Sequence, residues 1–354
     1  MVKIAFEKTK RNFSLCFYRR FKIIRLWNKE SGCDKIRTRK RGREAEISME
    51  RNPVKDGFSS LSQMAEELFG KGVRIVSREP LHGGDINDAY RVKLSAGEDI
   101  FVKVNSLGRA DFFRKEAAGL AALGSSEEIG VPRLLGFGTD RQEGIAFLAL
   151  EYIKSAPAIP AYWETFGHEL ARLHKAKCQS FVGSEGKYGF TENNYIGASP
   201  QKNTPREKWT DFFRECRLLP QLTMAESYLG ASLRKKADRL LERLDLYLRE
   251  PEFPSLLHGD LWGGNVLCGG DGRAWIIDPA AYVGDFEADL AMTQLFGSLP
   301  ERFYQAYHEI NPMDKEGYLQ RRELYNLYHL LNHLNLFGRM YLGSAAEIIN
   351  KYGS

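Results

Sequence analysis

The pattern of apolar and polar positions makes the first part of the chain rich in strands. Segments at 73–81, 88–94 and 99–105 combine apolar and β-branched residues and are bounded by glycine and polar residues, which predicts strands. The continuous apolar run IAFLALEYI at 145–153 predicts a buried strand. These strands predict a small antiparallel lobe over residues 59–152.

Two helices are predicted within this first lobe. The stretch ADFFRKEAAGLAAL, at 110–123, carries apolar residues at helical spacing and follows the third strand. A shorter helix precedes the first strand, and its face, its start and its end can each be assigned to residues. These are Leu61, Met64 and Leu68 on one face, Ser59 or Ser60 as the cap, and Gly70 or Gly72 at the end.

The second part of the chain, 153–354, is predicted to be mostly helical. Helices are expected at 162–177, 205–222 and 231–248 and from Phe286 to the end, with Pro205 in the first turn of the second of these. Between them, the segments 265–270 and 273–278 flank the turn GGDG and predict a hairpin. The fold class is therefore α+β, with a small β-rich lobe that contains one key helix and a larger helical lobe.

Charge separates the first 48 residues from the rest. Residues 1–48 hold 15 Lys/Arg and 5 Asp/Glu, a net of +10, whereas the remaining residues hold 36 and 41, a net of −5. We expect residues 1–48 to be a disordered basic extension, and the alternative is an amphipathic helix resting on anionic lipid. The mildly acidic remainder gives no indication of nucleic-acid binding.

Cysteine usage and hydropathy exclude two further classes. The five cysteines, Cys16, Cys33, Cys178, Cys216 and Cys268, are widely spaced and form no CxxC pair, which is typical of a reduced cytoplasmic chain without a disulfide framework or zinc site. No run of 18 apolar residues is present, so no transmembrane segment is predicted.

The stretch HGDLWGGNVL places polar side chains in a loop with three glycines. Asp260 and Asn265 lie five residues apart in it, and Asp278 follows at the end of the predicted strand AWIID. Phosphoryl transfer needs one carboxylate to accept the proton of an attacking hydroxyl, and an amide oxygen with a second carboxylate to hold Mg²⁺ on the phosphates. Asp260, Asn265 and Asp278 match these needs.

The partners that a nucleotide requires lie upstream. Lys103 stands inside a predicted strand, where a buried ammonium needs a carboxylate, and Glu116 on the following helix can supply it. The glycine turn in LHGGDINDAYRV can cover phosphates with backbone N–H groups, and it is not a Walker motif. Each feature alone has an ordinary reading as a hairpin, a solvated lysine or a turn, and it is their order along the chain that indicates a kinase.

These motifs resemble the fructosamine kinase (ketosamine-3-kinase) family, within the protein-kinase-like phosphotransferases that include aminoglycoside and choline kinases. The similarity covers about residues 60–350 and rests on GGDINDAYRV, FVKVN, YGFTENNYIGASPQKN, WTDFFRECRLLPQL, HGDLWGGNV and DPAAYVGDFEADLAM. The resemblance implies a two-lobed protein-kinase-like fold that uses ATP and Mg²⁺.

The resemblance also implies roles for individual residues. Asp260 would be the catalytic base, Asn265 and Asp278 would hold the metal, and Lys103 paired with Glu116 would contact the ATP phosphates. The remaining nucleotide contacts would come from Gly83, Gly84 and Asn87 in the phosphate-covering turn and from Glu151, Tyr152 and Ile153 in the hinge. Some family members have a Cys in this turn, and here the turn reads GGDIND.

Several other residues have supporting readings. We expect His258 to brace the catalytic loop, His168 and His174 to be helix-packing residues, and Asp285 and Asp289 to brace the loop and cap a helix. Trp262 either lines the acceptor pocket or anchors the loop.

The substrate that the resemblance implies is a ketoamine, small or protein-bound, phosphorylated on a sugar hydroxyl. The alternatives are a kinase for another hydroxylated amine, such as an aminoglycoside, and a catalytically inactive binding module. The presence of Lys103, Asp260, Asn265 and Asp278 argues against the last of these.

Overall fold

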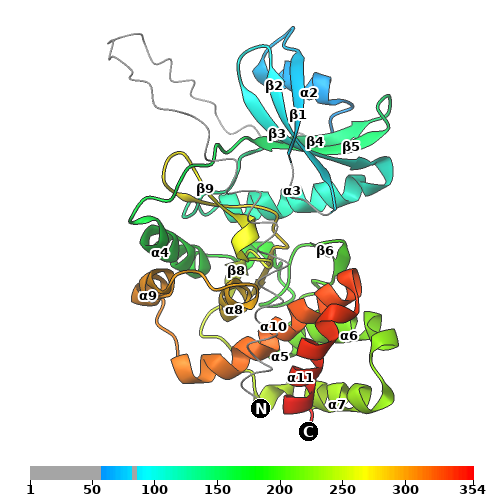
Figure 1. Ribbon diagram of the computed structural model, residues 1–354, viewed down its shortest axis with the longest axis vertical. Helices are drawn as coiled ribbons and strands as arrows, with labels where there is room; N and C mark the ends of the chain where they lie inside the picture. The colour runs from blue at the N-terminus through cyan, green and yellow to red at the C-terminus, as the bar shows by residue number, and fades with distance from the viewer. Residues whose placement is uncertain (1–56, 82–85) are drawn as a thin grey trace. The chain divides into compact units, whose positions relative to one another are not determined.

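The computed structural model describes residues 57–81 and 86–354, so the predicted extension 1–48 and the two glycines Gly83 and Gly84 lie outside the described residues. The first lobe is built on a five-stranded antiparallel sheet with the strand order β1-β2-β3-β5-β4 (Figure 1). Its strands are β1 (Ile75–Leu81), β2 (Asp88–Leu94), β3 (Asp99–Ser106), β4 (Leu134–Asp140) and β5 (Ile145–Glu151).

Two helices pack against this sheet, as the sequence predicts. Helix α2 (Leu61–Phe69) begins at Ser60, whose hydroxyl accepts the amide of Gln63, and Gly70 follows its last residue. Helix α3 (Ala110–Gly124) buries Phe113 and Leu120 against Leu148 of β5. In Figure 1, α3 lies between the sheet and the helical lobe.

Strand β4 was not among the predicted strands. Its sequence, LLGFGTD, contains two glycines, which weaken a strand pattern. The structure explains one of them, because a Cβ at Gly138 would lie 2.0 Å from the carbonyl oxygen of Phe58. The backbone of Phe58 pairs there with β4 through Phe137 and Thr139. The glycine therefore marks a close backbone contact and not a break in the sheet.

The second lobe is helical with three short strand pairs. Its α-helices are α4 (Tyr162–Lys175), α5 (Trp209–Phe212), α6 (Leu219–Met224), α7 (Ala231–Glu242), α8 (Glu287–Leu295), α9 (Glu301–Ile310), α10 (Lys315–Phe337) and α11 (Leu342–Tyr352). The strand pairs are β6 (Asn194–Ile196) with β7 (Ser199–Gln201), β8 (Ser255–Leu257) with β11 (Tyr282–Gly284), and β9 (Val266–Cys268) with β10 (Ala274–Ile276). Single 3₁₀ turns cover Leu107–Arg109, Gln179–Phe181, Glu226–Tyr228, Leu244–Leu246, Gly263–Asn265 and Arg339–Tyr341.

The prediction of a helix over 205–222 is wrong at its start. Pro205 precedes the helix, because Arg206 pairs its backbone with Tyr188 in an extended bridge. The helix begins at Trp209, and its middle turns, Phe213–Leu218, form a π-helix before α6 continues.

Three other elements are shorter in the structure than predicted. The helix predicted at 231–248 ends at Glu242, after which Arg243 leaves helical geometry and a 3₁₀ turn follows. The strand predicted at 145–153 ends at Glu151. The hairpin around GGDG is confirmed with strands of three residues each, so Asp278 stands two residues beyond its strand.

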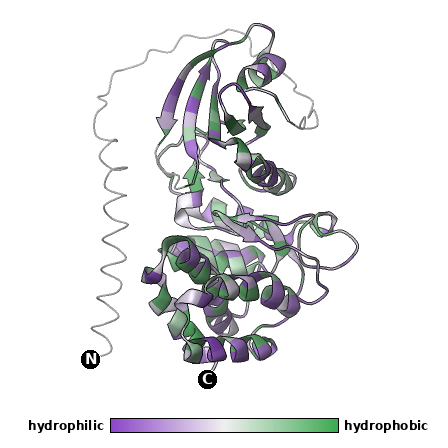
Figure 2. Cartoon of the chain, turned by 90° about the vertical axis from the view of Figure 1, so that its right-hand side faces the viewer, coloured by the Kyte–Doolittle hydropathy of each residue, from purple (hydrophilic) through white to green (hydrophobic). Residues whose placement is uncertain are grey.

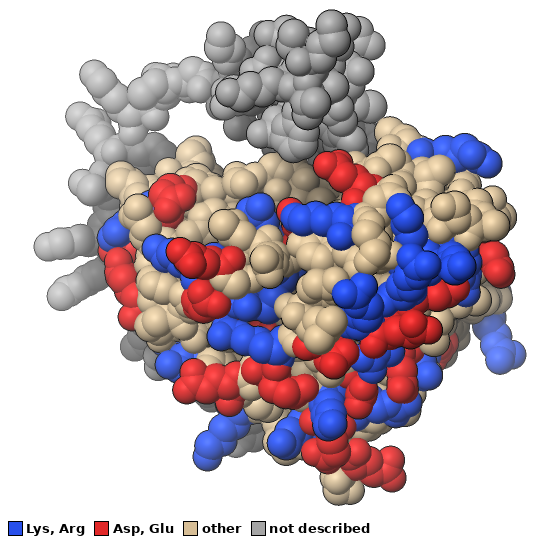
Figure 3. All heavy atoms as spheres, turned by 90° about the horizontal axis from the view of Figure 1, so that it is seen from below, with Lys and Arg blue, Asp and Glu red and all other residues tan. Residues whose placement is uncertain are grey.

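Hydropathy and charge are distributed as expected for a folded chain. Figure 2 shows hydrophobic and hydrophilic residues interspersed along the strands of the first lobe. On the face drawn in Figure 3, Lys and Arg are interspersed with Asp and Glu, so that face carries no large patch of one sign. Among the described helices, none is long and apolar enough to cross a membrane.

Candidate active site

Lys103 is the buried cation of the site. It stands in β3, and its Nζ donates to Glu116 Oε1 and to Asp278 Oδ1, each at 2.6 Å. Burial by itself would lower the pKa of Lys103, but the charges of Asp278 and Glu116 outweigh it and raise the pKa above its usual range. The predicted pair with Glu116 therefore forms, and the structure adds Asp278 as a second partner from the other lobe.

Asp278 reaches Lys103 because of an unusual backbone conformation. Its φ is +58°, in the left-handed region that few residues other than glycine adopt. The preceding residue is fixed by a hydrogen bond from the Ile277 amide to the carbonyl of Asn265, 3.0 Å long. The side chain is 43% exposed, so the carboxylate that holds Lys103 also faces open space. Strained backbone of this kind concentrates at functional sites.

The loop His258–Asn265, which we call the catalytic loop after its predicted role, contains Asp260. The side-chain Nδ2 of Asn265 donates to the backbone carbonyl of Asp260 at 2.9 Å and to Asp260 Oδ2 at 3.3 Å. Burial raises the pKa of Asp260 to about 7, the charge of Asp278 adds to the effect, and the hydrogen bond from Asn265 opposes it. A carboxylate poised near neutral pH suits a general base.

Two of the three glycines of the loop, Gly259 and Gly264, serve close packing. Gly259 has a φ of +80°, and a Cβ there would lie 2.1 Å from the carbonyl oxygen of Ala280. A Cβ at Gly264 would lie 2.3 Å from the indole of Trp262, so this ring folds over its own loop. This position is compatible with an anchoring role of Trp262, and both that role and a place in the acceptor pocket stay predictions.

Asp289 is hydrogen-bonded to the backbone at the start of the catalytic loop. Its carboxylate accepts the amides of His258 at 2.7 Å and Gly259 at 2.8 Å. It also accepts a hydrogen bond from His174 Nε2 at 3.3 Å, and His174 Nδ1 accepts from Tyr307 at 2.8 Å. Burial would raise the pKa of Asp289, but the hydrogen bonds that its carboxylate accepts, above all the one from His174, keep it below its ordinary value. The contacts expected of Asp289 are thus present, whereas its hydrogen bond with His174 had no counterpart in the sequence pattern.

His258 joins the loop to the Asp278 segment. Its Nε2 donates to the carbonyl of Ile277 at 2.8 Å, and burial lowers its pKa. His258 is therefore a neutral structural link, as its bracing role requires. Asp285 accepts the amide of Glu287, the first residue of α8, and the hydroxyl of Tyr325. His168 is partly exposed and bonds Glu309 of α9, so it contributes to the packing of α4 against α9, as expected.

The predicted nucleotide contacts of the first lobe are described only in part. Asn87 Oδ1 accepts from Asn105 Nδ2 at 2.9 Å, which ties the end of the glycine turn to β3. Glu151 ends β5, and its Oε2 accepts the amide of Arg133 at 3.2 Å. The ring of Tyr152 packs against the guanidinium of Arg91 at 5.0 Å. The hinge role of Glu151, Tyr152 and Ile153 stays a prediction.

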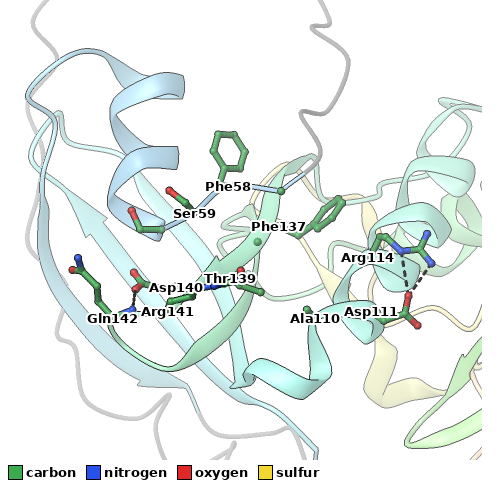
Figure 4. A pocket seen from close by; sticks show the side chains of 13 residues that line it. Phe58, Ser59, Ala110, Asp111, Arg114, Phe137, Thr139, Asp140, Arg141 and Gln142 are labelled. Carbon is green, nitrogen blue, oxygen red and sulfur yellow. Dashed lines mark hydrogen bonds and ion pairs between the residues drawn. The ribbon is translucent and has the colours of Figure 1, made fainter.

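Asp260 does not line either of two hollows on the described surface. One, of about 330 Å³, borders the glycine turn and is lined by Ile86, Asn87 and Asn105, among others. The other, of about 740 Å³, lies between the start of α3 and β4 (Figure 4). In Figure 4, Arg114 and Asp111 of α3 bond to each other at its side.

Asn265 and Asp278 are suited to a hard cation. In residues 57–81 and 86–354, no cluster of three or more His, Cys, Asp or Glu side chains could hold a metal. A magnesium site of the kind predicted needs only one or two protein oxygens, since phosphates and water complete the octahedron. The nitrogen of the Asn265 amide is engaged by Asp260, which leaves its oxygen for a cation.

The sequence reasoning missed two residues that hold the segment after Asp278. Asn194 Nδ2 donates to the carbonyl of Ala281 at 2.8 Å, and Gln201 Nε2 donates to that of Ala280 at 2.9 Å. Both residues lie in YGFTENNYIGASPQKN, one of the segments on which the family resemblance rests, to which the sequence assigns no role.

Comparisons with known proteins agree on the family. The fructosamine kinase family model matches residues 58–353. A probable ketoamine kinase of Synechocystis sp. is 38% identical over 299 residues, covering 83% of this chain and 96% of that protein. A chloroplastic protein-ribulosamine 3-kinase of Oryza sativa is 38% identical over 285 residues, covering 80% of each chain.

Solved structures agree on the fold. A protein from Thermobifida fusca, assigned as a fructosamine-3-kinase, superposes with a TM-score of 0.70 at 36% identity, over 83% of this chain and 98% of that one. A macrolide 2′-phosphotransferase from Brachybacterium faecium superposes with a TM-score of 0.53 at 16% identity, over 83% of this chain and 98% of that one. At that identity the second likeness shows the two-lobed fold alone.

Proposed function

The chain belongs to the fructosamine kinase family, and on that premise we propose that it transfers the γ-phosphoryl group of ATP to a sugar hydroxyl of ketoamines. The observation that carries the proposal is the set of contacts joining Lys103, Glu116 and Asp278, with Asp260 and Asn265 alongside. The relatives named as ketoamine and ribulosamine kinases support the substrate class.

Each residue of the site has a role that its surroundings support. When bound, MgATP supplies the electrophilic phosphorus and the charge that orders the site. Lys103 holds an anionic oxygen, and Glu116 keeps its ammonium in place. Asp278 and Asn265 provide the oxygens for Mg²⁺. Asp260 orients the acceptor hydroxyl and accepts its proton, in buried surroundings that raise its pKa to about 7.

The 3-hydroxyl is the acceptor that we propose, in keeping with the name of the rice relative. A phosphate ester at C3 has a chemical consequence. After the ketoamine loses a proton from C1 and becomes its enol, phosphate leaves C3 with the electron pair of the C3–O bond. Water then hydrolyses the resulting imine and releases the free amine. The proposed function is therefore removal of sugar adducts from amines.

A substrate panel tests this function. We expect fructoselysine or ribuloselysine to stimulate ATP consumption, followed by the release of free lysine. Psicoselysine, the C3 epimer of fructoselysine, tests the effect of configuration at C3. A set of aminoglycosides serves as the competing panel. Turnover of an aminoglycoside, without turnover of any ketoamine, would contradict the proposal and favour a kinase of another hydroxylated amine.

Two further properties belong to the same proposal. Protein-bound ketoamines are candidate substrates beside free ones, and phosphorylation of a glycated protein in the same assay separates the two. We also propose a cytoplasmic location. Its support is that Cys178, Cys216 and Cys268, the cysteines within the described residues, are free thiols.

A further inference from the structure

A short segment of the helical lobe contacts both halves of the candidate site. This segment, Glu192–Asn203, contains β6, β7 and the turn between them, and we call it the bracing arm. On one side it contacts α3, the helix that carries Glu116. On the other side it contacts the backbone that follows Asp278. In Figure 1, β6 lies below α3 at the boundary between the two lobes.

The contact with α3 consists of an ion pair and packed rings. Glu192 makes a two-point pair with Arg114, with Oε1 and Oε2 at 2.6 and 2.7 Å from the guanidinium nitrogens. Tyr195 packs against Phe112 with 5.0 Å between ring centroids, and Lys115 lies 5.2 Å from the centre of the Tyr195 ring. Phe112 and Arg114 both lie within one helical turn before Glu116, so these contacts fix the turn of α3 that reaches Lys103.

The contact with the Asp278 segment is buried and made by amides. Asn194 and Gln201 donate to the carbonyls of Ala281 and Ala280, and Gln201 also donates to Asn194 Oδ1 at 2.9 Å. Both side chains are almost fully buried. A buried amide group that loses its partner costs free energy, so this arrangement has one strongly preferred geometry.

Arg217 is hydrogen-bonded to the C-terminal end of the bracing arm. It is fully buried, and its guanidinium donates to the carbonyl of Lys202 at 2.6 Å and to Asn203 Oδ1 at 2.9 Å. The same guanidinium lies 3.8 Å from the centre of the Tyr282 ring, directly after Ala281. Arg217 belongs to the π-helical turn Phe213–Leu218, and π-helical turns are frequent at functional sites.

We infer that the bracing arm is a positioning element that holds α3 and the Asp278 segment in fixed register, so that Glu116 and Asp278 meet Lys103 before any nucleotide binds. This inference rests on the proposed function, since it assigns the arm to MgATP binding. Glu192, Asn194 and Gln201 are positioning residues, because they act through Glu116 and Asp278.

A charge exchange at the α3 contact tests the inference without disturbing the core, because the pair is partly exposed, at 43% for Arg114 and 32% for Glu192. In Glu192→Arg, two guanidinium groups face each other and α3 loses its anchor. We expect the dissociation constant for MgATP, measured by calorimetry, to rise about three- to tenfold, because losing a partly exposed pair has a modest effect. Amide hydrogen exchange within α3 should become faster.

The reversed pair should restore both measurements. In Arg114→Glu combined with Glu192→Arg, the introduced arginine faces the new glutamate and Asp111, so MgATP affinity should return to within about twofold of the wild type. Arg302 and Glu164 provide the matched control, because they also lie 2.6 Å apart and are 48% and 39% exposed. The same exchange at this pair should leave MgATP affinity and exchange in α3 unchanged.

The outcomes separate the inference from the proposed function. Wild-type affinity for MgATP in Glu192→Arg would overturn the bracing arm and leave the kinase assignment standing. A loss in Glu192→Arg that the reversed pair does not restore, or an equal loss in the control pair, would also overturn it. If the wild-type protein bound no MgATP at all, the proposed function would fail, and the inference would fail with it.

Discussion

The catalytic loop (His258–Asn265) and the Asp278 segment (Ile277–Ala281) each contribute one carboxylate to the candidate site, in opposite surroundings. Asp278 is partly exposed and paired with Lys103. Asp260 is half-buried, receives a hydrogen bond from the neutral Asn265, and has a pKa that desolvation raises to about 7. Two neighbouring carboxylates in different environments can take different chemical roles. Asp278, which is paired with Lys103, suits metal and phosphate binding, and Asp260, which is the less exposed of the two, suits proton transfer.

The two regions also differ in what supports them. The loop is held by the charged carboxylate of Asp289, whereas the Asp278 segment is held by the neutral amides of Asn194 and Gln201. Ala280 links the two regions, because its amide donates to the carbonyl of His258 at 2.9 Å. The difference predicts separable effects of mutations on turnover, nucleotide affinity and stability.

The largest effect is expected from Asp260→Asn. This change removes the proton acceptor and keeps the shape, so turnover should fall on the order of 10²–10⁴-fold. MgATP affinity, measured by calorimetry, should stay within about threefold of the wild type because Lys103 and Asp278 are untouched. Near-normal turnover of a ketoamine in this variant would remove Asp260 from its assigned role.

Asp278→Ala should act mainly on the nucleotide. It removes one carboxylate from Lys103 and one oxygen from the proposed Mg²⁺ site, so the MgATP dissociation constant should rise on the order of tenfold or more. The decisive measurement is a calorimetric titration of both variants with Mg²⁺ present. If Asp260→Asn and Asp278→Ala bind MgATP equally well, the division of roles between the two carboxylates is wrong.

Asp289→Asn should act mainly on stability. The new amide can accept one of the two backbone N–H groups of His258 and Gly259, and its nitrogen then faces the other. We expect the free energy of unfolding to fall by about 1–3 kcal/mol, measured by urea denaturation. Asp238→Asn, at an exposed carboxylate, is the control and should change it little. Equal stability of both variants would show that Asp289 does not support the loop.

A smaller effect is expected from pH. Burial lowers the pKa of His258 and lowers that of His329 to about 3, below the value of about 6.5 in an unfolded chain. As pH falls below about 6.5, the unfolded chain binds protons that the folded protein does not. The contribution of each such histidine to stability should therefore be constant above that pH and decrease below it, by up to about 1.4 kcal/mol per unit, whereas Asp260 and Asp285, whose pKa values are raised to about 7, contribute with the opposite sign.

Urea denaturation at pH 7.5, 6.5 and 5.5 measures this slope. In His329→Gln the slope between pH 6.5 and 5.5 should become smaller than in the wild type, while the slope that His258 contributes remains. An unchanged slope in this variant would contradict the assignment of His329 as a buried neutral group.

The smallest effect is expected from deletion of residues 1–48. The family match begins at residue 58, and the elements of the site all follow it. A chain that starts at Met49 should melt within a few degrees of the full-length protein and phosphorylate ketoamines at a similar rate. A several-fold loss of activity would assign the extension to the working enzyme.

The sequence predicted best what depends on local pattern. Ser60 as the cap of α2, the helix that carries Glu116 and the hairpin around GGDG are all confirmed, because capping, helical spacing and turn chemistry act within a few residues. The pattern failed at β4, where Gly138 is required by a neighbouring backbone, and at Pro205, where bridge pairing replaces a helix.

The sequence by itself determined which functional groups the candidate site contains and their order along the chain, which is typical of a phosphotransferase. The groups are one lysine (Lys103), three carboxylates (Glu116, Asp260 and Asp278) and one side-chain amide (Asn265). Only the tertiary structure decided how they are used. In it, Asp278 pairs with Lys103, and His174 is hydrogen-bonded to Asp289. Asn194 and Gln201 donate to the backbone carbonyls of the segment after Asp278. The physical reason is that these contacts join residues far apart in the chain. Their strength comes from burial and partner geometry, which a linear pattern does not encode.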